Sequence, residues 1–253
     1  MAPGQSPKEV IMVRPACFGF NEETLDNAFQ RSDFRLSERQ IHEDALKEFE
    51  AVVDLLKSNK VTVVIFNDSP MPTKPDAIFP NNWFSTHPDG SVVIYPMMAP
   101  VRRQEARMDM VKFLEDVYQV DKVFDLRKFE NEGLFLEGTG SIVFDHLHRK
   151  AFATLSSRTN LKLLRQVSKI LNYDLVTFEA FDRSGVPIYH TNVMMWIGTT
   201  VGAICAEAIT DSYDRVSLSI FKILTSDIKP SFAGNDLKRN PCIRTRNFDF
   251  EPR

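Results

Sequence analysis

The stretch LFLEGTGSIVFD, residues 134–145, places an acidic residue and a glycine turn directly before an apolar run of β-branched and aromatic residues. Such a run, bounded by glycine, serine or aspartate, is typical of a strand. The same pattern recurs around RPACF, AIFPNN, PIYHTN and SFAGN. It consists of a strand with a polar residue, a turn, a second strand and then a helix. The markers of the five segments are 65, 57, 53 and 44 residues apart: Arg14, Phe79, Leu136, Tyr189 and Ala233. A period of this size favours radially arranged modules over a doubly wound sheet.

Extended apolar runs alternate with helical patterns along the whole chain, which indicates the α/β class. We expect strands at 61–66, 91–96, 141–145, 176–181 and 192–198, and helices at 39–59, 102–118, 158–172 and 201–209. The apolar stripe of the first helix comprises Ile41, Ala45, Leu46, Phe49, Val52, Val53 and Leu56. No G-x-G-x-x-G motif opens a helix after a strand, which argues against a dinucleotide-binding fold.

Composition limits the classes of partner. The chain has 253 residues, 43% of them hydrophobic, and a formal charge of −3, which fits one large domain. Lysine and arginine are scattered, so we expect a small-molecule ligand rather than nucleic acid. No apolar leader begins the chain, and no run approaches the ~18 apolar residues that a membrane span needs. The three cysteines, odd in number and unevenly spaced, argue against a disulfide framework or a zinc site. We therefore expect a soluble cytoplasmic protein.

Three polar residues fall at the heads of the repeated modules: Asp76, Glu137 and His190. Taken singly, each has an ordinary structural interpretation, as a turn residue, a cap beside Gly138 and a half-buried histidine. A fold with pseudo-rotational symmetry would bring module heads together on its axis. Their equivalent positions therefore make them candidate site residues.

Five separate segments then resemble one known superfamily. KPDAIFPNNWFSTH, MAPVRRQEAR, FLEGTGSIVFD with ATLSSRTN, VPIYHTNVMMWIG and SFAGN are similar to the guanidino-group-modifying enzymes, most closely to their citrulline-utilisation, amidinotransferase-like branch. A more distant similarity to dimethylarginine dimethylaminohydrolase runs through the same places. The resemblance covers residues 9–235 and leaves a divergent polar tail at 236–253. It implies the pentein fold, an α/β propeller of ββαβ-type modules, in agreement with the repeat.

The resemblance also implies a reaction, in which a cysteine attacks the central carbon of a guanidinium or ureido group and hydrolysis or transfer follows. Glu137 would hold the substrate and orient His190, which would act as general acid and base. Asp76 would line the floor of the pocket. Arg158, together with Arg102 or its neighbour Arg103, matches arginines placed near the substrate's α-carboxylate. The alternative for these arginines is a solvated helix start or a surface ion pair. We expect no cofactor and no metal.

The pair Asn81 and Asn82 stands where the dimethylarginine relatives carry two acidic residues. If the stretch is a strand, alternation puts Asp76, Ile78, Pro80 and Asn82 on one face. A carboxylate suits a cationic guanidinium, whereas an amide, which donates and accepts, can match a neutral ureido group. The asparagine at position 82 therefore indicates a preference for citrulline-like substrates. His87, just before Pro88-Asp89-Gly90, is interpreted as a hairpin turn residue.

The end of the chain departs from the superfamily, which places its nucleophilic cysteine in a glycine-rich strand near the C-terminus. This chain reads DLKRNPCIRTRNFDFEPR after SFAGN, without strand alternation or a helical stripe, so we expect an incomplete fifth module. Cys242, whose neighbours Arg244 and Arg246 would favour a thiolate, and Cys17 are the candidate nucleophiles. Cys205 is expected in the core.

Two functions from different classes follow from these observations. One is an amidinohydrolase for arginine- or citrulline-type amino acids, inactive in this form if the usual cysteine is absent. The other is a non-catalytic pentein that binds an amino acid or a protein partner. An open fifth module would also favour a homodimer or another association through its unpaired strand edge.

Overall fold

The computed structural model describes residues 4–25, 27, 30, 35–118 and 120–211, and the backbone of the strand Arg244–Asn247. The chain divides into two compact units. The first unit is Pro7–Gly138, and the second consists of the residues before Pro7 together with the part from Thr139 onward. The predicted single domain over 9–235 with a tail over 236–253 stays a prediction.

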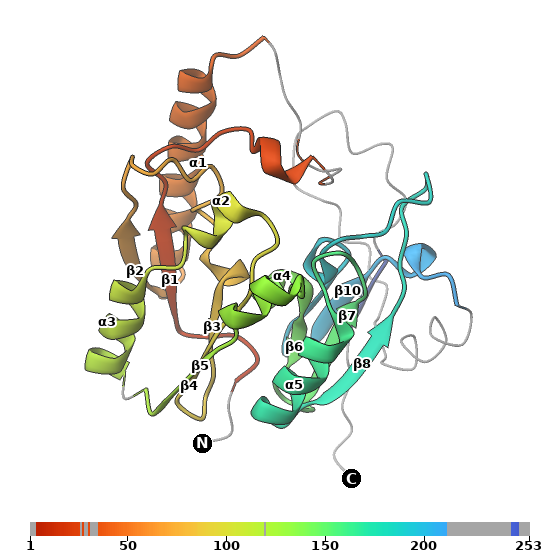
Figure 1. Ribbon diagram of the computed structural model, residues 1–253. Helices are drawn as coiled ribbons and strands as arrows, with labels where there is room; N and C mark the ends of the chain where they lie inside the picture. Colours follow the sequence, from red (N-terminus) through yellow and green to blue (C-terminus); the bar gives the residue numbers. More distant parts are fainter. Residues whose placement is uncertain are drawn as a thin grey trace. The chain divides into compact units, whose positions relative to one another are not determined.

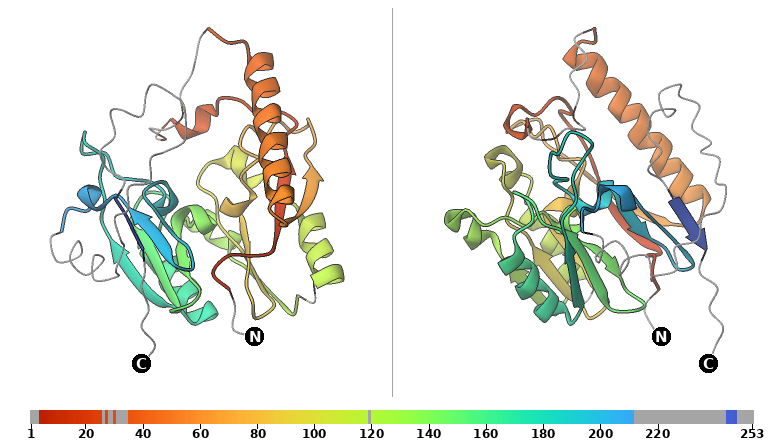
Figure 2. Two further views of the ribbon diagram at one scale, coloured as in Figure 1. Left: turned by 180° about the vertical axis from the view of Figure 1, so that it is seen from behind. Right: turned by 90° about the vertical axis from the view of Figure 1, so that its right-hand side faces the viewer.

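The first unit contains two sheets (Figure 1). Strands β1 (Glu9–Arg14) and β2 (Thr62–Asn67) pair in parallel, and α1 (Glu38–Ser58) connects them and packs along them (Figure 2). The second sheet has the order β3-β4-β5, with β3 (Phe84–Thr86) antiparallel and β5 (Lys122–Asp125) parallel to β4 (Ser91–Ile94). Helices α2 (Pro100–Arg103) and α3 (Met108–Tyr118) lie between β4 and β5 in the chain.

The second unit contains a sheet arranged like β3-β4-β5. Its sheet β6-β7-β8 has β6 (Val143–Asp145) antiparallel and β8 (Asp174–Phe178) parallel to β7 (Lys150–Thr154), and α5 (Leu161–Leu171) precedes β8 and contacts it (Figure 1). A further sheet has the order β11-β10-β9, with all pairs antiparallel. Its strands are β9 (Met195–Ile197), β10 (Val201–Ile204) and β11 (Arg244–Asn247).

A ββαβ pattern therefore occurs twice among the described residues, as β3-β4-α3-β5 and as β6-β7-α5-β8. A short helix opens each of three hairpins: η2 (Pro80–Asn82) before β3, α4 (Gly138–Ser141) before β6, and η4 (Thr191–Val193) before β9. The predicted α/β class and module type agree with this arrangement. The expected fifth module begins at residues 231–235, which lie outside the described part.

Each unit has its own apolar core, in which β-strand residues meet one helix or 3-10 turn. The core of the first unit comprises Val13, Ala77, Trp83, Phe84, Val92, Ile94, Met97, Met110, Val111 and Leu114. The core of the second unit comprises Phe152, Phe178, Ala180, Ile188, Met194, Met195, Ile204, Ala208 and Ile209. Full burial of one such side chain contributes about 1.5–3 kcal/mol. None of the helices in the described ranges has both the length and the hydropathy that crossing a membrane requires.

Several sequence predictions of local structure need correction. The segment 102–118 forms two helices, α2 and α3, rather than one. The segment 201–209 is a strand, β10, followed by the 3-10 helix η5 (Ala206–Ala208), because a tight turn from Gly198 to Val201 pairs it with β9. Val52 is 46% exposed and lies outside the buried stripe of α1. The tail contains β11, although its sequence shows no alternation.

Candidate active site

The segment from Asp76 to Asn82 is not a strand. The backbone turns at Asp76, whose carbonyl accepts from the Phe79 amide at 2.9 Å, and Pro80 then begins η2. Proline fixes its own φ and suits the first position of such a helix. The predicted alternation of one strand face is therefore wrong. Asp76 and Asn82 nevertheless approach the same side chain, Arg102.

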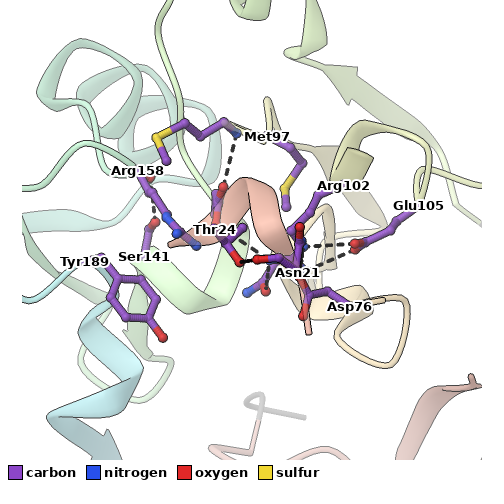
Figure 3. Close-up of polar contacts among 12 residues, drawn as sticks. Asn21, Thr24, Asp76, Met97, Arg102, Glu105, Ser141, Arg158 and Tyr189 are labelled. Atoms are coloured by element: carbon purple, nitrogen blue, oxygen red, sulfur yellow. Dashed lines mark hydrogen bonds and ion pairs between the residues drawn. The ribbon is translucent and has the colours of Figure 1, made fainter. Parts of the chain in front are cut away.

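Arg102 is buried and forms the centre of a polar cluster in the first unit (Figure 3). Its Nε and Nη2 donate to the two carboxylate oxygens of Glu105 at 2.9 and 3.0 Å, and its Nη1 donates to Asn82 Oδ1 at 3.0 Å. Its guanidinium also lies 3.6 Å from Asp76 and 3.8 Å from Glu137. We call Asp76, Glu105 and Glu137 the carboxylate cluster. The interpretation of Arg102 as a solvated helix residue is wrong, because α2 buries it.

The carboxylate cluster places three acids around one guanidinium. Burial raises the pKa of Glu105 to about 7, against the lowering effect of Arg102. Burial alone would lower the pKa of Arg102, but Glu105 and the other two carboxylates raise it above its ordinary value. Both Glu105 and Arg102 therefore have pKa values above their ordinary ones.

Raising the pH from about 5 to about 8 should destabilise the wild type relative to a Glu105→Gln variant. A free glutamate titrates near 4.5, whereas Glu105 keeps its proton up to about 7 in the fold, so unfolding releases a proton in this range. The free energy of unfolding of the wild type should fall as the pH rises, by at most about 1.4 kcal/mol per pH unit, and level off above the folded pKa. Urea denaturation of both proteins across this range measures the difference. A wild-type stability that stays constant or rises with pH relative to that of the variant would contradict the prediction.

Glu137 is fully buried at the end of the first unit. Its Oε1 accepts from the Met98 amide at 3.1 Å, and its Oε2 lies 3.8 Å from Arg102 Nη1. The next residue, Gly138, has φ +47°, and a Cβ there would lie 2.2 Å from the carbonyl oxygen of Asn81. Only glycine allows this approach, so Gly138 brings the chain of Glu137 against the Asn81–Asn82 segment.

His190 and Arg158 belong to the second unit. Both side chains are buried, and the Arg158 guanidinium lies 4.7 Å from the ring centroid of Tyr189 (Figure 3). Ser141 Oγ donates to the Arg158 carbonyl at 2.9 Å, and Thr191 Oγ1 donates to the Ser141 carbonyl at 2.6 Å. Short hydroxyl contacts therefore fix the backbone beside both candidate residues. Burial also excludes a surface ion pair as the role of Arg158.

Glu137 and His190 occupy equivalent positions, because each directly precedes the short helix that opens a hairpin. In the first hairpin the equivalent residue is Phe79, and Asp76 lies three residues earlier. The predicted equivalence therefore applies to Glu137 and His190. Asp76 reaches the carboxylate cluster through the turn instead, and Asn21 Nδ2 donates to its carboxylate at 2.6 Å (Figure 3).

The remaining candidates lie elsewhere or outside the described residues. Cys17 is partly buried, and its Sγ lies 3.8 Å from the Pro70 carbonyl oxygen. Cys205, predicted in the core, follows β10, is partly buried and packs against the core of the second unit. Cys242 lies outside the described residues. His87 lies at the hairpin turn as predicted. It is also buried, with Nε2 2.7 Å from Ser85 Oγ.

Sequence reasoning missed Glu105, the carboxylate that contacts Arg102 most closely. Its signal was the spacing Arg102-x-x-Glu105, because residues three apart on a helix face one another. No comparable signal existed for Asn21, which lies 55 residues from Asp76 in the chain. In the described ranges, no group of three or more His, Cys, Asp or Glu side chains is arranged to hold a metal ion.

Residues 14–229 match the family model described as N,N dimethylarginine dimethylhydrolase, eukaryotic. The chain therefore belongs to this family, within the guanidino-group-modifying pentein superfamily. A special closeness to its citrulline-utilisation branch stays a prediction. No curated protein matches the chain.

Solved structures show the same mixed α/β fold. The N-terminal domain of the cyanobacterial arginine dihydrolase ArgZ, bound to substrate, is 18% identical with a TM-score of 0.62, covering 84% of this chain and 71% of that domain. AgrE in complex with L-arginine is 17% identical with a TM-score of 0.65, covering 84% of this chain and 29% of AgrE. A dimethylarginine dimethylaminohydrolase adduct is 16% identical with a TM-score of 0.51, covering 75% and 64%.

Proposed function

We propose that this chain hydrolyses a carbon–nitrogen bond in the guanidino or ureido group of arginine- or citrulline-type amino acids. A cysteine thiolate attacks the central carbon, and His190 protonates the leaving amine and then takes a proton from the water that releases the product. Glu137 accepts hydrogen bonds from the substrate nitrogens and orients His190, and Asp76 lines the pocket floor. Arg158 binds the α-carboxylate through its planar fork of donors.

The carboxylate cluster carries this proposal. Three carboxylates gather around Arg102, and the Glu137 side chain among them is fully buried. A planar cation with several N–H donors, such as a guanidinium, is the complementary ligand. ArgZ is described as an arginine dihydrolase and was solved with substrate, which supports the same substrate class here.

Arg102 is better suited to a positioning role than to direct binding of the α-carboxylate. Its Nε, Nη1 and Nη2 already donate to Glu105 and Asn82. Exchange of these contacts for a substrate carboxylate would leave Glu105 buried without its partner. In this proposal Arg102 fixes Asn82 and the carboxylate cluster, and Arg158 alone meets the substrate's carboxylate.

A neutral ureido group is the second candidate substrate, and Asn82 favours it. Arginine only donates, so the atom of Asn82 that faces Arg102 Nη1 must be Oδ1, and the NH2 group of the amide can donate to a ligand. A ureido oxygen accepts such a bond, whereas a guanidinium has no acceptor. Citrulline-type substrates therefore fit Asn82, and arginine-type substrates fit the carboxylate cluster.

The nucleophile and the complete fold are also proposals. Cys17 and Cys242 are the candidate nucleophiles. The substrate-bound ArgZ domain is a cysteine-to-serine mutant, and another ArgZ mutant is covalently bonded to a reaction intermediate, which supports cysteine chemistry in that relative. Two ββαβ modules in the described part support a propeller built of such modules. We further propose a cytoplasmic location and association through an open sheet edge.

Purified protein should release ammonia or an alkylamine from arginine, N,N-dimethylarginine or citrulline. Mass spectrometry identifies the products, and the kcat/KM values for the three amino acids rank the substrates. An Asn82→Asp variant should improve guanidinium substrates relative to citrulline, because a carboxylate accepts from guanidinium N–H groups and Asn82 Nδ2 does not. An unchanged ranking would remove Asn82 as the specificity determinant. No turnover of any of the three would contradict the proposed hydrolase activity.

A non-catalytic amino-acid-binding pentein is the alternative, and the same protein samples distinguish it. Binding without turnover should still stabilise the fold, by about 2.7 kcal/mol at a ligand concentration a hundredfold above Kd. The thermal shift should disappear in Glu137→Ala if the carboxylate cluster is the binding site. Equal shifts in wild type and variant would remove Glu137 from it, and the absence of any shift would favour a partner-binding protein.

A further inference from the structure

The Met97–Met98 segment, between β4 and α2, is held by side chains at all its main-chain polar groups. The Met97 amide donates to Glu130 Oε1 at 3.0 Å, and the Met98 amide donates to Glu137 Oε1 at 3.1 Å. The two carbonyl oxygens accept from Arg103, from Nε at 3.0 Å and from Nη2 at 3.1 Å. The segment therefore depends on three charged side chains.

Arg103 contacts more than this segment. Its Nε also lies 3.5 Å from Glu130 Oε2, and its guanidinium lies 5.7 Å from the ring centroid of Phe135. Glu130 belongs to the 3-10 helix η3 (Arg127–Glu132), which ends shortly before Glu137 in the sequence. Arg103 and Glu130 thus hold opposite sides of one dipeptide, the first its carbonyls and the second an amide.

We propose that Arg103, with Glu130, is a positioning residue that orients Glu137 through the peptide of Met97 and Met98. This inference rests on the proposed function, in which Glu137 holds the substrate. This role differs from the expectation that Arg103 binds the α-carboxylate of the substrate, because the Arg103 guanidinium already donates to two main-chain carbonyls.

The path from Arg103 to Glu137 consists of two hydrogen bonds and one rigid peptide plane. Arg103 Nε fixes the Met97 carbonyl, and the peptide plane that contains this carbonyl also contains the Met98 amide. That amide donates to Oε1 of Glu137, and Arg102 lies 3.8 Å from the other oxygen, Oε2. Without Arg103 the peptide plane can turn, and the carboxylate loses its fixed direction.

Arg103→Ala should lower kcat for the best amino-acid substrate by about a hundredfold, because displacement of a reacting group by about 1 Å costs that much. KM should change less, because the α-carboxylate is bound elsewhere. Hydrogen exchange at the Met97 and Met98 amides should become at least about tenfold faster. Arg103→Lys should recover part of kcat, since an ammonium can donate to one carbonyl but lacks the planar fork.

Arg107→Ala is the matched control. Arg107 also donates to a main-chain carbonyl, that of Asn67, pairs with a carboxylate, Asp109, and lies over a phenylalanine ring, Phe66. It should change neither kcat nor exchange at Met98. Wild-type kcat in Arg103→Ala, or unchanged exchange at the Met98 amide, would overturn the inference.

If Arg103→Ala does not fold, the same two measurements on Arg103→Lys decide it. If the wild type turns over no substrate, the proposed function fails, and exchange at Met98 alone decides whether Arg103 holds the segment.

Discussion

Alanine at position 138 should unfold the first unit at a much lower temperature than the wild type. Gly138 has φ +47°, which costs a non-glycine residue roughly 1–2 kcal/mol. The added Cβ would also lie 2.2 Å from the carbonyl oxygen of Asn81 and 2.9 Å from that of Asn82. Both atoms belong to the backbone, so no side-chain rotation relieves the overlap. We expect a loss of about 4 kcal/mol or more, in the range that only severe local conflicts reach.

Gly133→Ala is the control that distinguishes steric overlap of an added Cβ from backbone strain, because it lies in the same unit. Gly133 also has a left-handed conformation, with φ +67°, but a Cβ there meets nothing within 4 Å. Its replacement should cost only the conformational strain, roughly 1–2 kcal/mol. Thermal melts should show a fall of at least about 10 °C for Gly138→Ala and a few degrees for Gly133→Ala. Equal melting temperatures would mean that the Asn81–Asn82 backbone moves away at little cost.

The same glycine explains why one part of the candidate site was predictable from sequence. Glu137 and Gly138 are neighbours in the chain, and a charged residue before a glycine turn at a module head marks both in the sequence. His190 stands at the equivalent point of its own module, directly before η4. Local patterns that repeat therefore located the residues at hairpin entries.

Contacts between distant segments could not be predicted in this way. Arg102 and Asn82 lie 20 residues apart, and their hydrogen bond depends on a turn and a 3-10 helix that the sequence indicated as a strand. The apolar residues of 201–209 fit a helix in isolation, yet pairing with β9 makes β10 a strand. Tertiary pairing overrides local spacing in both places. The side chains around Arg102 are therefore a result of the fold rather than of any motif.

Two buried histidines allow a direct comparison of catalytic and structural roles. His190→Ala should lower kcat by 10²–10⁴-fold, the usual contribution of a general acid–base residue, and change the melting temperature little. The backbone around His190 is held without its imidazole, because Ser156 Oγ donates to the Tyr189 carbonyl at 2.7 Å and the Thr191 hydroxyl anchors the following residue. Loss of the ring should therefore remove chemistry and leave the fold.

His87→Ala should produce the opposite result. Its Nε2 lies 2.7 Å from Ser85 Oγ, which is itself 2.8 Å from the hydroxyl of the buried Tyr95. Removal of the imidazole breaks this buried polar chain and should cost about 1–3 kcal/mol of stability, because a buried group loses its hydrogen-bond partner. Turnover per folded molecule should stay within a factor of a few of the wild type. Urea denaturation and steady-state kinetics on the two variants and the wild type make the comparison. A His190→Ala protein that melts early but keeps its kcat would assign His190 to the structure of the second unit and leave the proposed hydrolase without its general acid.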